Sequence, residues 1–340
     1  MYKYSEVTQV HLEPTQLCQA SCPMCDRNKN GGEVNQYLKE ASLSIDDVKK
    51  MFPIEFVKQL KHIYFCGNHG DPIFAPDMLE MCEYFREHNP YISLLVTTNG
   101  GARTTEWWER LAELDVTVNF SVDGLEDTNH LYRQGVSWKR VEESMDAFCS
   151  AGGYAKWTFL VFNYNEHQVE EAERFSKLLG VKEFIVKKSG RYLTASLERK
   201  EKHQAVNRKG LGELLSEPTN PKYRNKALQE EVDVIKIIAE EKVVPKCQQK
   251  KEIYVSAEGF VHPCCWTAGR MYKWYKEPES EQIWENINAH ESNALKSSIQ
   301  HVMEGGFFKS IEDRWTGDNR LEVCALKCNK KFDPFEAQWK

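Results

Sequence analysis

Short β-prone runs alternate with amphipathic helical patterns over the first 190 residues of this 340-residue chain. Helix starts carry capping residues, such as Ser44 and Thr104. Six strand–helix units in succession predict an α/β fold with a parallel sheet, open or closed into a barrel, whose ligand site lies at the carboxyl ends of the strands. The expected strands are Gln9–Glu13, His62–Cys66, Ile92–Thr97, Val116–Ser121, Trp157–Asn163 and Phe184–Lys187, and the expected helices are Ile45–Leu60, Asp77–Glu87, Thr105–Leu114, Trp138–Ala151 and Glu166–Leu179.

The chain changes character after this alternation. Residues 191–245 are rich in Lys, Glu and Asn and contain one amphipathic stretch, Leu228–Ile238, so we expect a connector or a substrate-side insertion. From Cys247 onward the chain is rich in Cys and Trp, with short strand-like pieces. We therefore predict three regions, 1–190, 191–245 and 246–340.

Composition narrows the classes of function. The net charge of −6 and the pI near 6.0 favour neither nucleic acid nor an anionic membrane as a partner. No apolar run approaches the roughly 20 residues of a membrane span, and the N-terminus lacks a signal-peptide pattern. The 11 cysteines therefore predict a cytoplasmic protein that uses thiols for metal ligation more than for disulfides.

Three cysteines, Cys18, Cys22 and Cys25, follow the first expected strand with the spacing C-x3-C-x2-C. Thiolates at this spacing can reach three corners of one iron–sulfur cube and leave the fourth iron open to an exchangeable ligand. A zinc site is the alternative, but it needs a fourth ligand that the local sequence does not supply.

The triplet resembles the cluster motif of the radical S-adenosylmethionine (SAM) superfamily. In that family the open iron of a [4Fe–4S] cluster binds the amino and carboxylate groups of SAM. Met24 matches the apolar residue that the family places before the third cysteine, near the adenine. The resemblance implies a partial (β/α)6 TIM-like barrel over residues 1–190.

Polar loops follow the next strands and extend the resemblance. Gly70 and Asp71 stand where the family's Gly-Gly-Glu-Pro loop binds the SAM amino group, with Asp in place of Glu. The alternative is a tight turn capped by Asp71. Thr98 and Asn99 end the third strand and suit ribose hydroxyls.

The fourth and fifth strands end in further candidates. Ser121 and Arg133 match the family's Ser-x-Asp-Gly segment and its later arginine, which implies contacts with the SAM carboxylate or ribose. A guanidinium can bind a carboxylate through two hydrogen bonds. Asn163 and Asn165 stand where relatives contact ribose or adenine.

The C-terminal cysteines resemble the auxiliary-cluster domain of the SPASM/Twitch subfamily. The full SPASM pattern has seven cysteines, whereas five are present here, so the shorter Twitch form with one auxiliary [4Fe–4S] cluster fits better. The resemblance implies Cys247, Cys264, Cys324 and Cys328 as ligands, with Cys265 as a spare or substitute. The x3 spacing of the last pair departs from the usual x2. A structural zinc site is the alternative.

The family's chemistry implies an oxidoreductase. It would cleave SAM reductively to a 5′-deoxyadenosyl radical, abstract a substrate hydrogen atom, and oxidise or crosslink a small molecule or peptide with the auxiliary cluster as electron acceptor. The external electron donor would be a flavodoxin or ferredoxin. About eight residues precede the first strand, which tilts the expectation towards a small molecule or a leader-independent peptide.

Two other classes of function stay open. One is a redox-neutral radical epimerase or lyase, and the other is a non-catalytic zinc-binding scaffold. His69 and His262 lie near the two cysteine groups in sequence, and we expect both to be hydrogen-bonded structural histidines.

Overall fold

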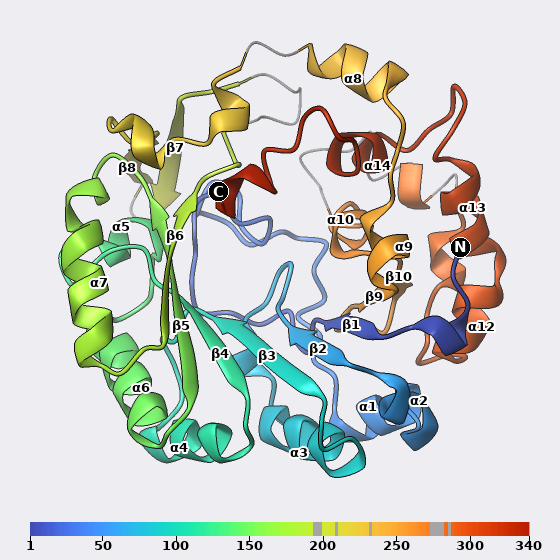
Figure 1. Ribbon diagram of the computed structural model, residues 1–340, viewed down its shortest axis with the longest axis horizontal. Coiled ribbons are helices and arrows are strands. Elements are labelled where there is room, and N and C mark those ends of the chain that lie inside the picture. The colour runs from blue at the N-terminus through green and yellow to red at the C-terminus, as the bar shows by residue number, and fades with distance from the viewer. Residues whose placement is uncertain (193–198, 208–209, 231–232, 273–281, 285–286, 340) are drawn as a thin grey trace. The chain divides into compact units, whose positions relative to one another are not determined.

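The computed structural model describes residues 1–192, 199–207, 210–230, 233–272, 282–284 and 287–339 (Figure 1). Its strands are β1 (Gln9–Leu12), β2 (His62–Phe65), β3 (Ser93–Thr98), β4 (Thr117–Ser121), β5 (Tyr154–Val161), β6 (Glu183–Lys188), β7 (Lys202–Asn207), β8 (Gly210–Ser216), β9 (Glu252–Val255) and β10 (Val261–His262). Within the described part of the chain, eight of them form a sheet in the order β10-β9-β1-β2-β3-β4-β5-β6, and β7 pairs with β8. The predicted parallel α/β sheet is confirmed.

One compact unit comprises Met1–Leu17, Asn35–Leu94 and Asp233–Asp333. Its strand β1 pairs in parallel with β2 on one side and with β9 on the other, while β10 runs antiparallel to β9. Most residues of β1, β9 and β10 and alternate residues of β2 are buried, which supplies the apolar core. The helices are η1 (Tyr4–Glu6), α1 (Ile45–Met51), α2 (Ile54–Gln59), η2 (Pro72–Phe74), α3 (Met78–His88), α8 (Val234–Glu240), α9 (Lys246–Lys250), α10 (Cys265–Ala268), η6 (Ala289–Glu291), α12 (Ile299–Glu304), α13 (Gly306–Asp313) and α14 (Glu322–Lys327).

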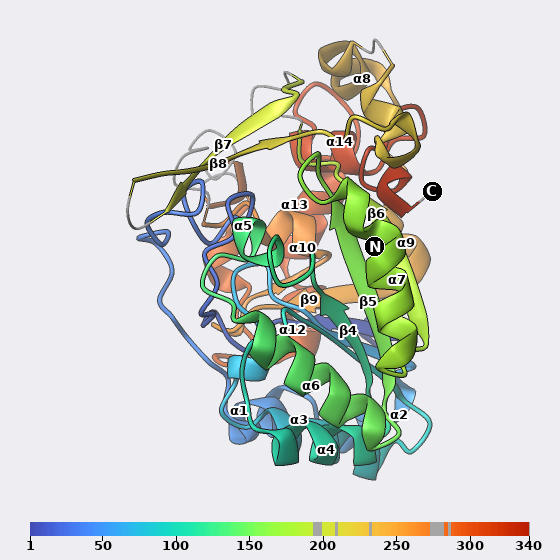
Figure 2. The same cartoon turned by 90° about the vertical axis from the view of Figure 1, so that its left-hand side faces the viewer.

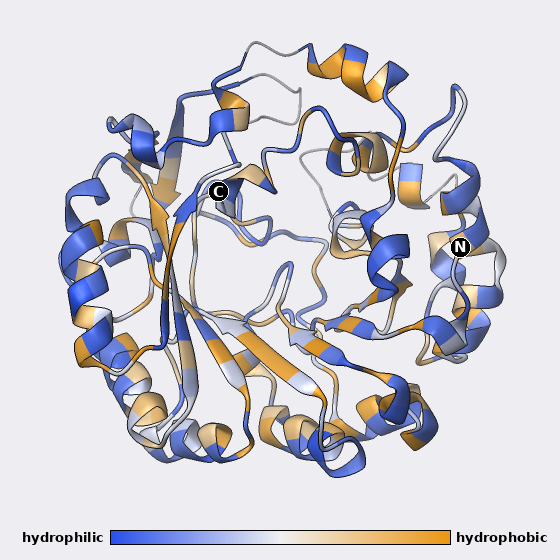
Figure 3. Ribbon diagram, in the orientation of Figure 1, coloured by the Kyte–Doolittle hydropathy of each residue, from blue (hydrophilic) through white to orange (hydrophobic). Residues whose placement is uncertain are grey.

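The other unit comprises Cys18–Val34, Leu95–Val232 and Pro334–Lys340. Its strands β4, β5 and β6 are parallel neighbours, and α6 and α7 lie along them (Figure 2). These helices carry hydrophobic and hydrophilic residues on different sides, as their periodicity predicts (Figure 3). The helices are α4 (Thr105–Glu113), α5 (Asn129–Tyr132), α6 (Trp138–Ser150), η3 (Glu166–Gln168), α7 (Val169–Leu178), η4 (Pro221–Tyr223), η5 (Lys226–Leu228) and η7 (Ala337–Trp339).

The six predicted strands are present, each within a few residues of its expected ends. The single helix predicted over Ile45–Leu60 is wrong, because Pro53 lacks the amide hydrogen that a continuous helix needs and α1 and α2 form in its place. The stretch Leu228–Ile238 contains the end of η5 and part of α8, and residues 231–232 lie outside the described residues. The predicted three-region division stays a prediction.

Candidate functional site

The cysteine triplet lies in an irregular loop of the second unit, held by turn hydrogen bonds. The amide of Cys25 donates to the carbonyl of Cys22 at 3.1 Å, and the amide of Asn28 donates to that of Cys25 at 3.1 Å. Cys22 is buried, while Cys18 and Cys25 are half-buried. The loop therefore holds three thiols within eight residues without a regular element.

Two side chains, Arg133 and Asn99, direct N–H donors at sulfur atoms of this triplet. Arg133 Nη1 lies 3.8 Å from Cys22 Sγ, and Asn99 Nδ2 lies 3.7 Å from Cys18 Sγ. Burial raises the pKa of Cys22 to about 11, and the guanidinium of Arg133 opposes that shift. Iron binds the thiolate form, so hydrogen-bond donors beside the sulfurs fit an iron–sulfur cluster.

Arg133 has a second partner, because its Nε donates to Asp123 Oδ2 at 2.6 Å. Asp123 is fully buried at the end of β4, and its Oδ1 accepts from the amide of Leu160 at 2.8 Å. The guanidinium is thus fixed between the carboxylate of Asp123 and the thiol of Cys22. Its predicted contact with SAM stays a prediction.

The candidates after β3 and β4 lie at strand ends, as predicted. Asn99 Oδ1 accepts from Gln19 Nε2 and from the amide of Gly101, both at 2.8 Å. Thr98 is 2% exposed, and its hydroxyl accepts from the amide of Gly100 at 3.0 Å. Ser121 is half-buried as the last residue of β4. Asn99 is the member of this group that approaches a cysteine.

The remaining candidates of this unit differ in exposure. Asn165 is fully buried; its amide donates to the carbonyls of Asp123 and Leu160, and its oxygen accepts from the amide of Phe162. These bonds give Asn165 a structural role in the loop, and its SAM contact stays a prediction. Asn163 is exposed and pairs with the backbone of Ser216. The carbonyl of Met24 accepts from Arg191 Nη1, which follows β6.

The loop after β2, in the first unit, is shaped by two glycines. A Cβ on Gly67 would lie 2.2 Å from the carbonyl oxygen of Gly70, and one on Gly70 would lie 1.9 Å from that of Thr15, so neither position accepts a side chain. Asp71 caps η2 by accepting from the amide of Ile73 at 3.3 Å. Asp71 therefore forms the capped turn that the sequence offers as the alternative to SAM binding. The contact of Asp71 with SAM stays a prediction.

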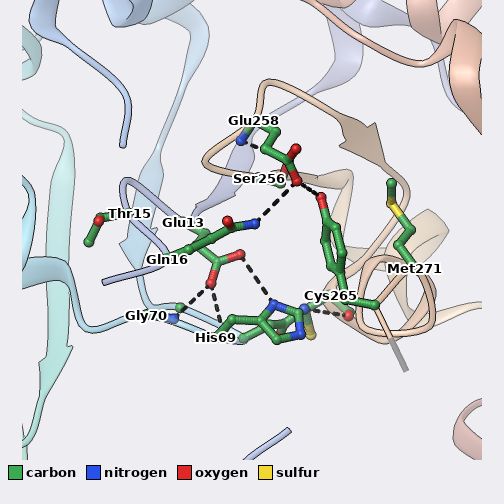
Figure 4. A network of polar contacts seen from close by, with 12 residues as sticks. Glu13, Thr15, Gln16, His69, Gly70, Ser256, Glu258, Cys265 and Met271 are labelled. Atoms are coloured by element: carbon green, nitrogen blue, oxygen red, sulfur yellow. Dashed lines mark hydrogen bonds and ion pairs between the residues drawn. The ribbon is translucent and has the colours of Figure 1, made fainter. Parts of the chain in front are cut away.

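Glu13, which sequence reasoning did not single out, organises this loop (Figure 4). Its Oε1 accepts from the amides of His69 at 2.7 Å and Gly70 at 3.1 Å, and its Oε2 accepts from the Tyr254 hydroxyl. Burial raises the pKa of Glu13, but the neighbouring His69 and Tyr254 lower it by more, so the carboxylate is ionised. The sequence signal that could have identified Glu13 is the presence of a carboxylate directly after the first strand.

A second carboxylate extends the network of Figure 4. Glu258 Oε2 accepts from Gln16 Nε2 at 3.3 Å and from the Tyr272 hydroxyl. Glu13, His69 and Glu258 follow β1, β2 and β9, which are neighbouring parallel strands. Their convergence at the carboxyl ends of the strands matches the expected position of a ligand site.

The C-terminal cysteines come from separate elements of the first unit. Cys247 lies in α9, Cys264 precedes α10, Cys324 lies in α14, and Cys328 follows α14. Because α14 is helical, the x3 spacing places Cys324 and Cys328 one turn apart on one face. Burial raises the pKa of Cys324, and the thiols of the other three raise it further, so the four lie within electrostatic reach.

Cys265 stands apart from this group. Burial raises its thiol pKa first, followed by its neighbour Cys264, then Glu252 and Cys66. Across the described residues, no group of three or more His, Cys, Asp or Glu side chains is arranged around a single metal ion. In a cubane cluster each thiolate binds a different iron, so the ligands need not surround a single metal ion. The cluster assignments therefore stay predictions.

Comparison with known proteins supports the resemblance. Residues 12–176, just under half of the chain, match the model of the Radical SAM superfamily. The family implies a [4Fe–4S] cluster, SAM and catalysis. No protein of curated function matches the sequence significantly. In the part of the chain that the structure describes, no helix is long and apolar enough to cross a membrane.

Solved structures share the fold at low identity. SuiB of Streptococcus suis, bound to its precursor peptide SuiA, has a TM-score of 0.58 and 14% identity, covering 98% of this chain and 76% of that chain. Against another SuiB structure (TM-score 0.52, 14% identity), 77% of this chain spans 61% of that chain. The protein anSMEcpe with bound AdoMet has a TM-score of 0.56 and 15% identity, covering 94% and 85%. These neighbours confirm the partial-barrel fold class.

Proposed function

We propose that this protein is a radical SAM enzyme whose catalytic [4Fe–4S] cluster is held by Cys18, Cys22 and Cys25. The observation that carries the proposal is the pairing of these thiols with Arg133 and Asn99 inside the matched domain. When bound, the cluster supplies the electron that cleaves SAM. The protein's own groups hold the thiols, orient the ligands and exclude water.

The SAM-binding groups are assigned by resemblance, and the geometry supports them unequally. Support is best for Asn99, which reaches both a cysteine and a glycine-rich turn. Support is weaker for Asn165, because its side-chain amide already donates hydrogen bonds to the backbone carbonyls of Asp123 and Leu160. The full assignment is Met24, Gly70, Asp71, Thr98, Asn99, Ser121, Arg133, Asn163 and Asn165.

An auxiliary [4Fe–4S] cluster on Cys247, Cys264, Cys324 and Cys328 completes the proposal and gives the protein a Twitch-like C-terminal region. The mutual electrostatic effect of these four thiols supports the assignment. The eleven cysteines, all within the described residues, form no disulfide with one another, and we place the protein in a reducing compartment, the cytoplasm.

The proposed reaction is oxidation or crosslinking of a peptide or small molecule, with an electron passing to the auxiliary cluster and an external flavodoxin or ferredoxin as donor. SuiB is bound to the precursor peptide SuiA and anSMEcpe to the Cp18Cys peptide in solved structures of this fold. These neighbours favour a peptide substrate over a small molecule.

The test is anaerobic reconstitution with iron and sulfide, followed by incubation with dithionite and SAM. Two cubane clusters predict about eight irons per chain, together with 5′-deoxyadenosine. About four irons with deoxyadenosine would remove the auxiliary cluster from the proposal. Zinc in place of iron, with no cleavage of SAM, would refute the enzyme and leave the scaffold.

A further inference from the structure

Lys327 is a buried lysine in the helix that carries two of the thiols proposed for the auxiliary cluster. It lies in α14 of the first unit, three residues after Cys324 and directly before Cys328. The residue is 6% exposed. Burying an ammonium group costs free energy unless neighbouring groups compensate its charge, so the surroundings of Lys327 indicate what the charge serves.

The ammonium group of Lys327 contacts the indole ring of Trp266. Its Nζ lies 4.2 Å from the ring centroid, which is a cation–π contact. Trp266 belongs to α10, which begins directly after Cys264 and packs against α14. The indole is the outer member of this pair, since Trp266 is 38% exposed and Lys327 is buried. The contact therefore ties the helix that follows Cys264 to the helix that carries Cys324.

A second lysine beside Cys328, Lys246, has an acidic partner, because it forms an ion pair with Asp333. Burial has the largest effect on the pKa of Cys328 and raises it. The backbone amide and the charge of Lys246 lower that pKa, Asp333 raises it, and Lys327 lowers it. The charges of Lys246 and Asp333 offset each other in part, so Lys327 supplies a further positive charge close to the thiol.

A fixed positive charge beside an iron–sulfur cluster affects its two redox states unequally. A [4Fe–4S] cluster on four thiolates is negatively charged, and it becomes more negative when it accepts an electron. A nearby cation therefore stabilises the reduced state more than the oxidised state, and burial strengthens this attraction because water screens it less. Net charge is one of the factors that set the reduction potential of such clusters.

We infer that the Lys327 ammonium group, held against Trp266, raises the reduction potential of the auxiliary cluster and so makes the cluster a better electron acceptor. The inference rests on the proposed function, because it uses the assignment of that cluster to the four C-terminal cysteines. It also deepens that function. An electron-accepting cluster is needed when the net reaction removes electrons from the substrate, so this charge favours an oxidation over a redox-neutral reaction.

The experiment is a potentiometric titration of the reconstituted full-length Cys22→Ala protein, followed by EPR spectroscopy. This parent protein lacks one of the three proposed ligands of the catalytic cluster, so the signal reports the auxiliary cluster. Lys327→Met removes the charge and should move the midpoint potential to more negative values, whereas Lys327→Arg keeps the charge and should retain most of the parent midpoint. The control is Lys330→Met, at an exposed position two residues after Cys328, which should leave the midpoint unchanged because solvent screens that charge.

Three outcomes of this titration would overturn the inference. They are an unchanged midpoint in Lys327→Met, an equal shift in Lys330→Met, and an equal shift in Lys327→Arg. The last would make packing the cause, and a role confined to the C-terminal turn of α14 would leave the midpoint unmoved.

Iron content separates these results from a failure to assemble the cluster. If Lys327→Met loses iron, Lys327→Gln, which keeps a polar end, is titrated in its place and should show the same negative shift. Loss of iron from both neutral variants would overturn the inference, because Lys327 would then be required for assembly. A Cys22→Ala parent that holds no cluster fails the proposed auxiliary cluster itself.

Discussion

The two cysteine groups of this protein use different structural solutions. The N-terminal triplet lies in an irregular loop, where Arg133 opposes the effect of burial on the pKa of Cys22. The C-terminal group is carried mainly by helices, and there the pKa of Cys247 is raised by burial and then by the thiols of Cys264 and Cys328. At Cys328 of the second group, Lys246 and Lys327 oppose the effect of burial in the same way. Burial raises the thiol pKa in both groups, so in both a bound metal would favour the thiolate form.

The largest effect is expected from removing a cysteine of the N-terminal group. Cys22→Ala removes one of three ligands, so deoxyadenosine formation should fall to background and iron should decrease by about four per chain. The matched control is Cys149→Ala, on α6, which should keep both. Undiminished deoxyadenosine from Cys22→Ala would show that the triplet does not hold the catalytic cluster.

The next largest effect is expected from removing a cysteine of the C-terminal group alone. Cys324→Ala should lower iron by about four per chain, because it removes one of four cluster ligands, and SAM cleavage should continue. Cys265→Ala is the control and should retain all the iron, since Cys265 lies outside the proposed ligand set. Iron analysis of the two variants checks this, and a larger loss from Cys265→Ala would exchange their roles.

A third change sharpens the electrostatic comparison. In the Cys324→Ala background, Arg133→Met removes the cation that lowers the pKa of Cys22. A higher thiol pKa leaves fewer thiolates at a given pH, so the midpoint of cluster loading should move to higher pH, and Arg133→Lys should restore part of the shift. The measurement is cluster absorbance after reconstitution from pH 6 to 9, and an unmoved midpoint would contradict the role given to Arg133.

The smallest expected effect concerns Asn99. Asn99→Ala removes one hydrogen bond to Cys18 and should slow SAM cleavage about fivefold, in line with about 1 kcal/mol. Asn99→Asp has the same shape but places a negative charge beside a thiolate, so it should be slower still. Initial rates of deoxyadenosine formation decide the order, and an Asp variant faster than the Ala variant would contradict it.

Local patterns were enough to predict most elements but not their distant pairings. The six strands follow from β-prone runs, and the break at Pro53 could have been predicted because proline removes a backbone donor. The pairing of Gln9 with Glu252 could not, since no periodicity links positions so far apart. Residues 246–340 therefore contribute two strands, β9 and β10, to the main sheet, beyond the cysteines that the sequence highlighted.

The candidate site shows the same limit. Motif spacing identified the cysteines and the loops, but the pairing of Arg133 with Asp123 and Cys22, and the network around Glu13, depend on folds of the chain that spacing does not encode. Asn165 shows the converse, because its predicted ligand role rests on position while its hydrogen bonds serve the backbone.

The pairing of β9 with β1 has a consequence for how the protein is made. Until residue 255 has left the ribosome, the edge of β1 that later receives β9 stays without its partner. An open strand edge invites pairing with other chains, so the nascent protein carries an aggregation-prone surface for most of its synthesis. Translation speed and chaperone supply should therefore affect the yield of soluble protein.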